Sequence, residues 1–242
     1  IDLLYEDEEI ASVMGTYAYH SYWTDDNFTL KYAFGKYLKL QYPEVEVEMS
    51  EWCELPNKHK ADDIEAGLIM ARTIGEDITN TGVNSWSSWV GVNEGGEDAD
   101  SMIAVDWDNY DNYRISKRYY AMGHYTKFVP VGSYAVDVDL TVGDITAEKT
   151  DDWNDWINGK AYQGYRIKNY LTVSGFRTPE GNYVAVIVNE GEDKEVSFNM
   201  LGYDAKVYTT DSERDLELTS EIKGHKKITI GAKSITTVVF ER

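Results

Sequence analysis

The period of the apolar residues changes once along the chain, and this change constrains the fold more than any other feature. Up to Pro130, short apolar stretches alternate with segments whose apolar residues recur at helical spacing. Beyond Pro130 the apolar residues recur at every second position, as they do in 184–188. The first pattern is typical of a parallel sheet covered by helices, and the second of an antiparallel β-sandwich. The sequence therefore predicts two units, 1–130 and 131–242.

The first unit is expected to hold three strand–helix pairs. Each expected strand is a short apolar stretch, and in each expected helix the apolar residues lie on one face. Such pairs in succession imply a parallel sheet, because parallel strands need a crossover connection. A longer acidic loop is expected between the last strand and the last helix. The predicted strands cover 12–17, 45–49 and 83–90, and the predicted helices cover 28–41, 64–78 and 114–129.

The charge of the chain limits its partners. Asp and Glu number 43 against 23 Lys and Arg, and the net charge of -20 disfavours nucleic acid and anionic membranes. No apolar run reaches the roughly 20 residues of a membrane-spanning helix. Cys53 is the only cysteine, which excludes an internal disulfide and a cysteine-built zinc site. The acidic start is unlike a signal peptide and lacks an initiator Met, so we expect the chain to begin inside a longer polypeptide.

The ends of the three predicted strands carry the candidate functional residues. In parallel β/α architectures the functional groups gather at the carboxyl ends of the strands, where the loops are free to vary. Here those ends combine a carboxylate with aromatic rings. A sugar ring stacks its CH face on indole while its hydroxyls need polar partners, so the combination favours carbohydrate chemistry. The candidates are His20 and Tyr22 after the first strand, Glu51 and Trp52 after the second, and Trp86 and Trp89 in the third.

Each of these residues also has a purely structural interpretation. A glutamate at the end of a strand, such as Glu51, is more often a solvated group than a nucleophile. His20 is more often a hydrogen-bonded core histidine than a catalytic group. Trp86 and Trp89 are three positions apart, so on a regular strand only one of them lines the site and the other packs beneath a helix. The spacing alone leaves the function open.

Four motifs in the first unit resemble the C-terminal half of glycoside hydrolase family 30. They are "YAYHSYW" (17–23), "MSEWCEL" (49–55), "NSWSSWV" (84–90) and "SKRYYAMGHYTKF" (116–128). The stretches "LTVSGFRTPEGNYVAVIVNEG" and "KSITTVVF" in the second unit resemble the side β-domain of that family. The resemblance implies an α/β plus all-β fold. Residues 1–130 would be the last three units of a (β/α)8 barrel, and 131–242 an antiparallel β-sandwich side domain.

The resemblance implies a retaining mechanism with Glu51 as the nucleophile and His20, Tyr22, Trp52, Trp86 and Trp89 as substrate contacts. Such a mechanism needs a second carboxyl group about 5 to 5.5 Å away as acid/base. In the family that glutamate follows the fourth barrel strand, inside an "NEP"-like motif, and that strand would lie upstream of Ile1. The Asn-Glu pairs at 93–94 and 189–190 follow Glu51 and lack the proline. Within the chain, Glu54 is the nearest candidate in sequence.

The missing half of the barrel is therefore an expected partner, in cis or as a second chain. Without it the chain is expected to be inactive and poorly soluble, because an open sheet would expose apolar strand faces and edges.

The acidic stretch "NEGGEDAD" (93–100) should repel a uronate. The expected substrate is a neutral plant cell-wall β-glycan, either xylan or β-1,6-galactan, and the expected location is secreted or extracellular. No cofactor or metal is expected, since "DWDNYDN" (106–112) lacks the spacing of an EF-hand loop. The alternative is a non-catalytic carbohydrate-binding or structural module.

Overall fold

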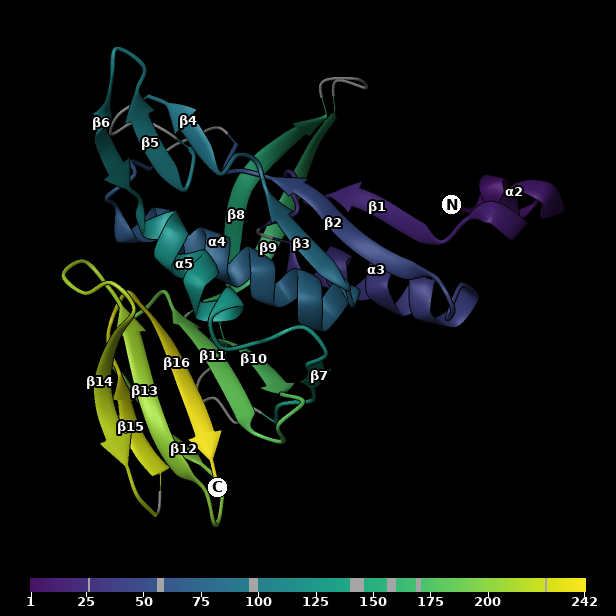
Figure 1. The fold of residues 1–242 in the computed structure, drawn as a ribbon. Coiled ribbons are helices and arrows are strands. Elements are labelled where there is room, and N and C mark those ends of the chain that lie inside the picture. The colour runs from purple at the N-terminus through teal and green to yellow at the C-terminus, as the bar shows by residue number, and fades with distance from the viewer. Residues whose placement is uncertain are drawn as a thin grey trace.

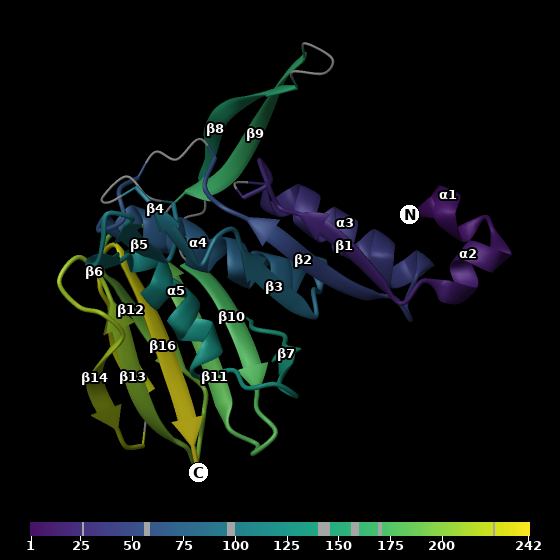
Figure 2. The same cartoon turned by 45° about the horizontal axis from the view of Figure 1, so that its top comes forward.

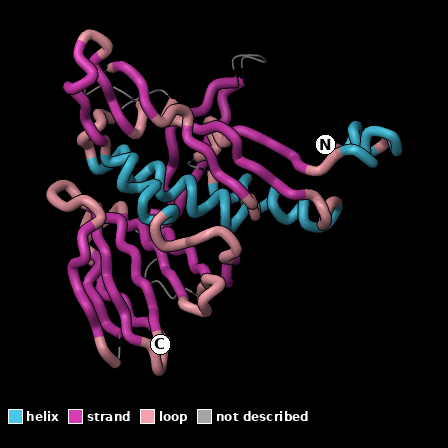
Figure 3. Tube along the Cα trace, viewed as in Figure 1, coloured by secondary structure: helices cyan, strands magenta, loops and turns pink. Residues whose placement is uncertain are grey.

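The computed structural model describes residues 1–25, 27–55, 59–95, 100–139, 146–155, 160–168, 171–224 and 226–242. Its elements form layers, with helices lying between a parallel sheet and a larger antiparallel sheet (Figures 1 and 3). None of the described helices is long and apolar enough to cross a membrane.

In the described part of the first unit, three parallel strands are hydrogen-bonded in the order β1-β2-β3. The first crossover helix begins after Asn27, whose side chain accepts a hydrogen bond from the Leu30 amide at 3.0 Å, and it ends before Pro43. The prediction of three strand–helix pairs in a parallel arrangement is confirmed. The strands are β1 (Thr16–His20), β2 (Glu46–Trp52) and β3 (Ser85–Ser88); the helices are α3 (Phe28–Gln41), α4 (Ile64–Glu76), which continues into the π-helical η1 (Asp77–Thr81), and α5 (Lys117–Thr126).

The predicted strand 12–17 is wrong over its first part. Two short helices, α1 (Asp2–Tyr5) and α2 (Glu8–Val13), precede β1. Asp7 caps the second of them, because its carboxylate accepts from the backbone amides of Glu9 and Ile10.

The expected acidic loop after β3 is also wrong, because it forms a small sheet. In the described residues, β4 (Val92–Glu94) pairs with β5 (Ile103–Asp106), which pairs with β6 (Asn109–Ile115). Residues 106–112, which contain the acidic motif, form the tight turn of the β5–β6 hairpin and the start of its second strand.

Helix α4 lies between the two sheets, which explains why nearly all of its residues are buried. A Cβ atom at Gly75 would lie 2.4 Å from Ser174 Oγ and 2.7 Å from the Tyr125 hydroxyl, so this glycine allows the close packing of α4 on its neighbours. The main hydrophobic core joins Met49 of β2 and Leu68 of α4 with residues of the antiparallel sheet such as Val186. This core is continuous across residue 130.

The alternating pattern beyond Pro130 does produce antiparallel strands. The predicted turn at "RTPEGN" is present, with the Thr178 amide donating to the Asn182 carbonyl at 2.9 Å and Gly181 in the left-handed region at φ 86°. A second core lies on the face of the large sheet away from α4, where Ile187 packs with Ile230 and Phe240.

The described strands of the large sheet run in the order β14 (Glu217–Ile222), β13 (Asp204–Thr210), β16 (Ser234–Glu241), β11 (Tyr183–Asn189), β10 (Leu171–Arg177) and β7 (Tyr134–Val136). Two further pairs complete the described strands: β12 (Lys194–Phe198) with β15 (Lys226–Ile230), and β8 (Thr146–Asp155) with β9 (Lys160–Lys168). The β8–β9 hairpin extends away from the rest of the chain (Figure 2).

The face of the parallel sheet opposite the helices is exposed and carries small or polar side chains. The expectation that an open sheet would expose apolar strand faces is therefore wrong. The reason is that the large apolar side chains of β1 to β3 that belong to the core, such as Val47 and Met49, point toward the helices. Some large apolar side chains of the first unit are nevertheless exposed, and they lie on helices, for example Leu3 (81%), Val13 (81%) and Leu40 (76%). The exposed sheet face carries Thr16, Ala18, Glu46, Ser50, Ser85 and Ser87.

Candidate active site

Glu51 lies at the carboxyl end of β2, directly opposite His20 of β1. The register of the two strands shifts between Tyr19 and His20, which makes His20 the partner of Glu51. The Tyr22 hydroxyl donates a hydrogen bond to Glu51 Oε1 at 2.8 Å, and His20 Nδ1 lies 3.8 Å from the same oxygen. The Glu51 side chain is 28% exposed. The structure therefore brings three of the predicted site residues together around one accessible carboxylate.

Tyr22 is held as a neutral hydrogen-bond donor. Burial, followed by the hydrogen bond to Glu51, raises the pKa of its phenol well above the usual value. Its ring meets the ring of His20 edge to face, with 5.6 Å between centroids. Tyr22 thus fixes one oxygen of Glu51 without adding a charge beside it.

Cys53 lies next to this group. Its Sγ is 4.0 Å from the Tyr22 hydroxyl. Burial, reinforced by the carboxylates of Asp100 and Glu51, raises the pKa of its thiol to about 11. The raised pKa favours the protonated thiol at neutral pH.

Trp89, and not Trp86 or Trp52, presents its indole at this end of the sheet. Trp89 is 52% exposed, and its backbone amide donates to the Trp52 carbonyl at 2.8 Å. Trp86 points to the helix side, where its Nε1 donates to Asp77 Oδ2 at 2.9 Å. Of the two tryptophans, Trp89 is therefore the one whose exposed side chain is available to the candidate site.

Trp52 differs from its predicted role as a substrate contact. It is 1% exposed and packs against Trp86, with 5.9 Å between ring centroids. The side chain has no surface to offer a sugar, and it supports the end of β2 from below. This burial follows from the irregular end of β2, where the register with β3 shifts between Met49 and Trp52.

Trp23 was not among the predicted site residues, yet it lies beside the cluster. It is 41% exposed, and its ring centroid is 6.0 Å from that of Tyr22. The backbone at Trp23 is left-handed, with φ 59°, which turns the chain sharply after β1. Its place directly after "YHSY" was the one available signal.

Glu54 does not serve as a partner of Glu51. Its Oε2 lies 2.8 Å from Arg118 Nη2, and its Oε1 lies 2.5 Å from His59 Nδ1. The Arg118 guanidinium also donates to the His59 carbonyl at 3.1 Å. Glu54 is therefore part of a buried ion pair that joins the end of β2 to α5.

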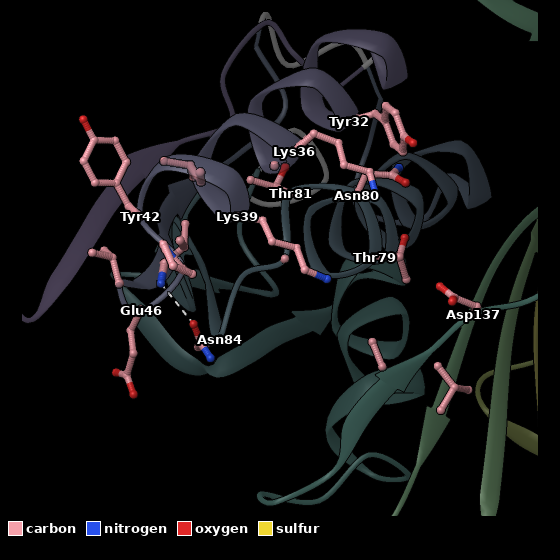
Figure 4. Close-up of a pocket in the computed structure, with 18 of the residues that line it drawn as sticks. Tyr32, Lys36, Lys39, Tyr42, Glu46, Thr79, Asn80, Thr81, Asn84 and Asp137 are labelled. Atoms are coloured by element: carbon pink, nitrogen blue, oxygen red, sulfur yellow. Dashed lines mark hydrogen bonds between the residues drawn. The ribbon is translucent and has the colours of Figure 1, made fainter. Parts of the chain in front are cut away.

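A cavity of about 690 Å³ lies at the opposite end of the parallel strands, where Glu46 begins β2 and Asn84 precedes β3. Figure 4 shows it, with Lys36 and Lys39 of α3 on one side and Asp137 on the other. Its lining includes none of the predicted site residues. We assign the candidate site to the Glu51 end, because the carboxyl ends of parallel strands hold the functional loops.

The described residues include no group of three His, Cys, Asp or Glu side chains placed to hold a metal ion.

Comparison with known proteins supports the resemblance given by the motifs. Residues 163–238 match the glycosyl hydrolase family 30 beta sandwich domain. Two solved structures are similar in fold over nearly the whole chain. One is a conserved exported protein from Bacteroides fragilis, with a TM-score of 0.70 at 22% identity over 93% of this chain and 45% of that one. The other is a GH30 endoxylanase from Clostridium papyrosolvens C71, with a TM-score of 0.69 at 19% identity over 100% of this chain and 52% of that one.

A third similar structure is a family 30 subfamily 8 xylanase from Clostridium acetobutylicum, with a TM-score of 0.66 at 17% identity, covering 100% of this chain and 52% of that one. The chain spans about half the length of each of these three proteins. The antiparallel unit is thus similar in sequence to the family, and the whole chain is similar in fold. Residues 163–238 therefore match the β-sandwich domain of glycosyl hydrolase family 30 in sequence, and the chain as a whole shares its fold with about half of each of these structures.

Proposed function

We propose that the chain is the C-terminal portion of a retaining, endo-acting glycoside hydrolase, with Glu51 as its nucleophile. Residues 1–130 would form the last three units of a (β/α)8 barrel, and 131–242 its side domain. The observation that carries the proposal is the hydrogen bond of 2.8 Å from Tyr22 to Glu51 at the carboxyl end of a parallel strand.

The chemistry follows from the two oxygens of Glu51. Because Oε1 accepts the hydrogen bond from Tyr22, Oε2 is the atom that attacks the anomeric carbon. The bond from that carbon to the leaving oxygen breaks, and an acid protonates the oxygen as it departs. Water then hydrolyses the resulting glycosyl ester of Glu51 and restores the carboxylate.

The proposed acid/base group is not among the described residues that contact Glu51. Glu54 is occupied by Arg118 and His59, which leaves it poorly suited to protonate a leaving group. The proposed source is the rest of the barrel, in cis or on a second chain, which would pair with the outer strands β1 and β3. The exposed polar face of the sheet would then become part of a barrel interior.

The proposed substrate is a neutral plant cell-wall β-glycan, either xylan or β-1,6-galactan. The exposed indoles of Trp89 and Trp23 offer stacking surfaces beside Glu51. Asp100 and Glu94 follow Trp89 in the chain, and their charges disfavour a uronate. Degradation of such a polymer takes place outside the cell, so we propose a secreted or extracellular location. The fold shared with an exported protein is consistent with this location.

An activated substrate tests the role of Glu51 without the missing acid. A fluorinated xylobioside or β-1,6-galactobioside with a dinitrophenyl leaving group needs no acid, because dinitrophenolate departs without protonation. Such a substrate should label Glu51 once per chain. Intact-mass measurement and peptide mapping would locate the sugar, and hydrolysis of the polysaccharides by the same chain should be absent. Absence of label, or label that persists in Glu51→Gln, would overturn the assignment.

A non-catalytic carbohydrate-binding module is the second candidate. The exposed indole of Trp89 favours it, because binding needs no acid/base. Glycan binding by the chain without any labelling would support this function over the first.

A further inference from the structure

Asp77 is a buried carboxylate at which several elements of the first unit meet. It is the first residue of η1, and its side chain is fully buried. Among the described side chains, Lys31 Nζ lies 2.8 Å from Oδ1 and forms a buried ion pair with it. The buried charge is thereby compensated, which a carboxylate at this depth requires.

Three further groups donate hydrogen bonds to Asp77. The Tyr19 hydroxyl donates to Oδ1 at 3.1 Å, and Trp86 Nε1 donates to Oδ2 at 2.9 Å. The Ser21 hydroxyl lies within reach of both oxygens, at 2.8 and 2.9 Å. The carboxylate therefore accepts from the end of β1 and from β3, the two strands that flank the strand of Glu51.

These contacts reach the residues around Glu51 through the backbone. Ser21 is the residue between His20 and Tyr22, both of which face Glu51. Trp86 lies on the strand that leads to Trp89. A shift of Asp77 would therefore move the neighbours of Glu51 on both sides.

We propose that Asp77 is a positioning residue of the glycan site, which holds the end of β1 and strand β3 at the correct distance from Glu51. This inference rests on the proposed function. A carboxylate suits the position because it is an acceptor only, and its two oxygens serve three hydrogen-bond donors and one ammonium charge. Asparagine would place an NH2 group against hydroxyl, indole or ammonium donors.

The test removes the negative charge together with its counter-charge. In Asp77→Asn with Lys31→Met, both charges of the buried ion pair are removed together, so the chain should still fold, as judged by far-ultraviolet circular dichroism. Its Kd for xylohexaose or β-1,6-galactohexaose should rise about tenfold. The control is Lys117→Met with Asp215→Asn, which removes a more exposed ion pair, at 2.7 Å between α5 and a loop of the second unit, and should leave the Kd unchanged.

A second readout needs no glycan. In NMR spectra of the ligand-free chain, the ring signals of His20 and Tyr22 should move in the double variant, and those of His124, buried against the antiparallel sheet, should not. If the parent binds neither glycan, the proposed function fails, and these spectra alone decide the role of Asp77. A folded double variant with unmoved ring signals would overturn the positioning role.

A milder variant covers the case in which the double variant does not fold. Ser21→Ala removes one donor and leaves the Lys31–Asp77 ion pair in place. It should raise the Kd in the same direction by a smaller factor and move the same His20 and Tyr22 signals. Unchanged affinity and unchanged spectra in this variant would equally contradict the proposal.

Discussion

Glu54 Oε2 and Arg118 Nη2 lie 2.8 Å apart, in an ion pair whose side chains are 6% and 1% exposed. This pair links the end of β2 to helix α5. Glu54 is three residues from Glu51 in sequence, yet its environment assigns it to stability and not to chemistry.

Glu54→Gln should therefore destabilise the chain without removing the nucleophile. The substitution removes the charge of one partner of a buried ion pair, a kind of change that costs about 3 to 5 kcal/mol of unfolding free energy. Urea unfolding would measure the loss, and the folded fraction should still be labelled at Glu51. Glu48→Gln, on the exposed sheet face, is the control and should change stability by less than about 0.5 kcal/mol. Loss of labelling in fully folded Glu54→Gln would show a catalytic role instead.

Tyr22→Phe should slow labelling and leave the fold intact. The variant keeps the ring contact with His20 and loses the hydrogen bond that fixes Glu51 Oε1. We expect the rate of labelling to fall by about tenfold to a hundredfold, because the carboxylate loses its orientation. Tyr17→Phe, on the helix side of β1, should label at the parent rate. A parent-like rate in Tyr22→Phe would mean that this hydrogen bond does not orient the nucleophile.

Trp89→Ala should mainly weaken glycan binding, whereas Trp86→Ala should mainly lower the stability of the chain. Removing the exposed Trp89 indole should weaken glycan binding by about tenfold at nearly unchanged stability, as expected for a stacking contact made in ground and transition states alike. Removing Trp86 deletes a core contact and the hydrogen bond to Asp77, so it should lower the unfolding midpoint. Calorimetric titration measures the glycan affinity, and urea unfolding measures the stability. The reverse pattern would show that Trp86, and not Trp89, lies on the strand face that meets the glycan.

His124 should make the chain sensitive to acid. It is buried between α5 and the large sheet, with its ring nitrogens 2.7 Å from Thr237 Oγ1 and 2.8 Å from Thr210 Oγ1. Burial, with a smaller effect of Lys127, lowers its pKa from 6.5 to about 3. Because the unfolded state binds the proton more tightly, the stability that His124 contributes is complete above pH 6.5 and is lost as the pH falls toward 3.

The corresponding measurement is the urea midpoint at several pH values below 6.5. Buried Glu76 acts in the opposite sense, since burial raises its pKa to about 7 and its contribution is lost as the pH rises from 4.5 toward that value. The parent must therefore be compared with His124→Gln, whose midpoint should fall less on acidification. His20→Gln, at an exposed ring, is the control. Equal acid sensitivity of the parent and His124→Gln would contradict the prediction.

Local signals in the sequence predict much of this fold. Helix α3 has both of its ends marked, by the cap at Asn27 and by Pro43. Functional groups of parallel β/α folds gather at the carboxyl ends of the strands, and this rule alone predicts that His20 and Tyr22 lie near Glu51, as they do.

The remaining features depend on contacts that are distant in sequence. The burial of Trp52 follows from a register shift between two strands, which no local pattern reports. Asp77 is joined to residues 56 and 58 positions away, and in the sequence it is one more acidic residue at the end of a helix. The β5–β6 hairpin was hidden by its many charges, although Ile103 and Val105 alternate as a strand requires.

The core that α4 shares with the antiparallel sheet restricts how such proteins can be recombined. A crossover between two relatives at residue 130 would join the helices of one parent to the sheet of the other. Leu68 and Ile74 of α4 would then face foreign partners in place of Phe176 and Val186, and close-packed interiors tolerate such changes of shape poorly. A chimera that exchanges the sandwich together with α4 and α5 keeps both sides of this interface from one parent.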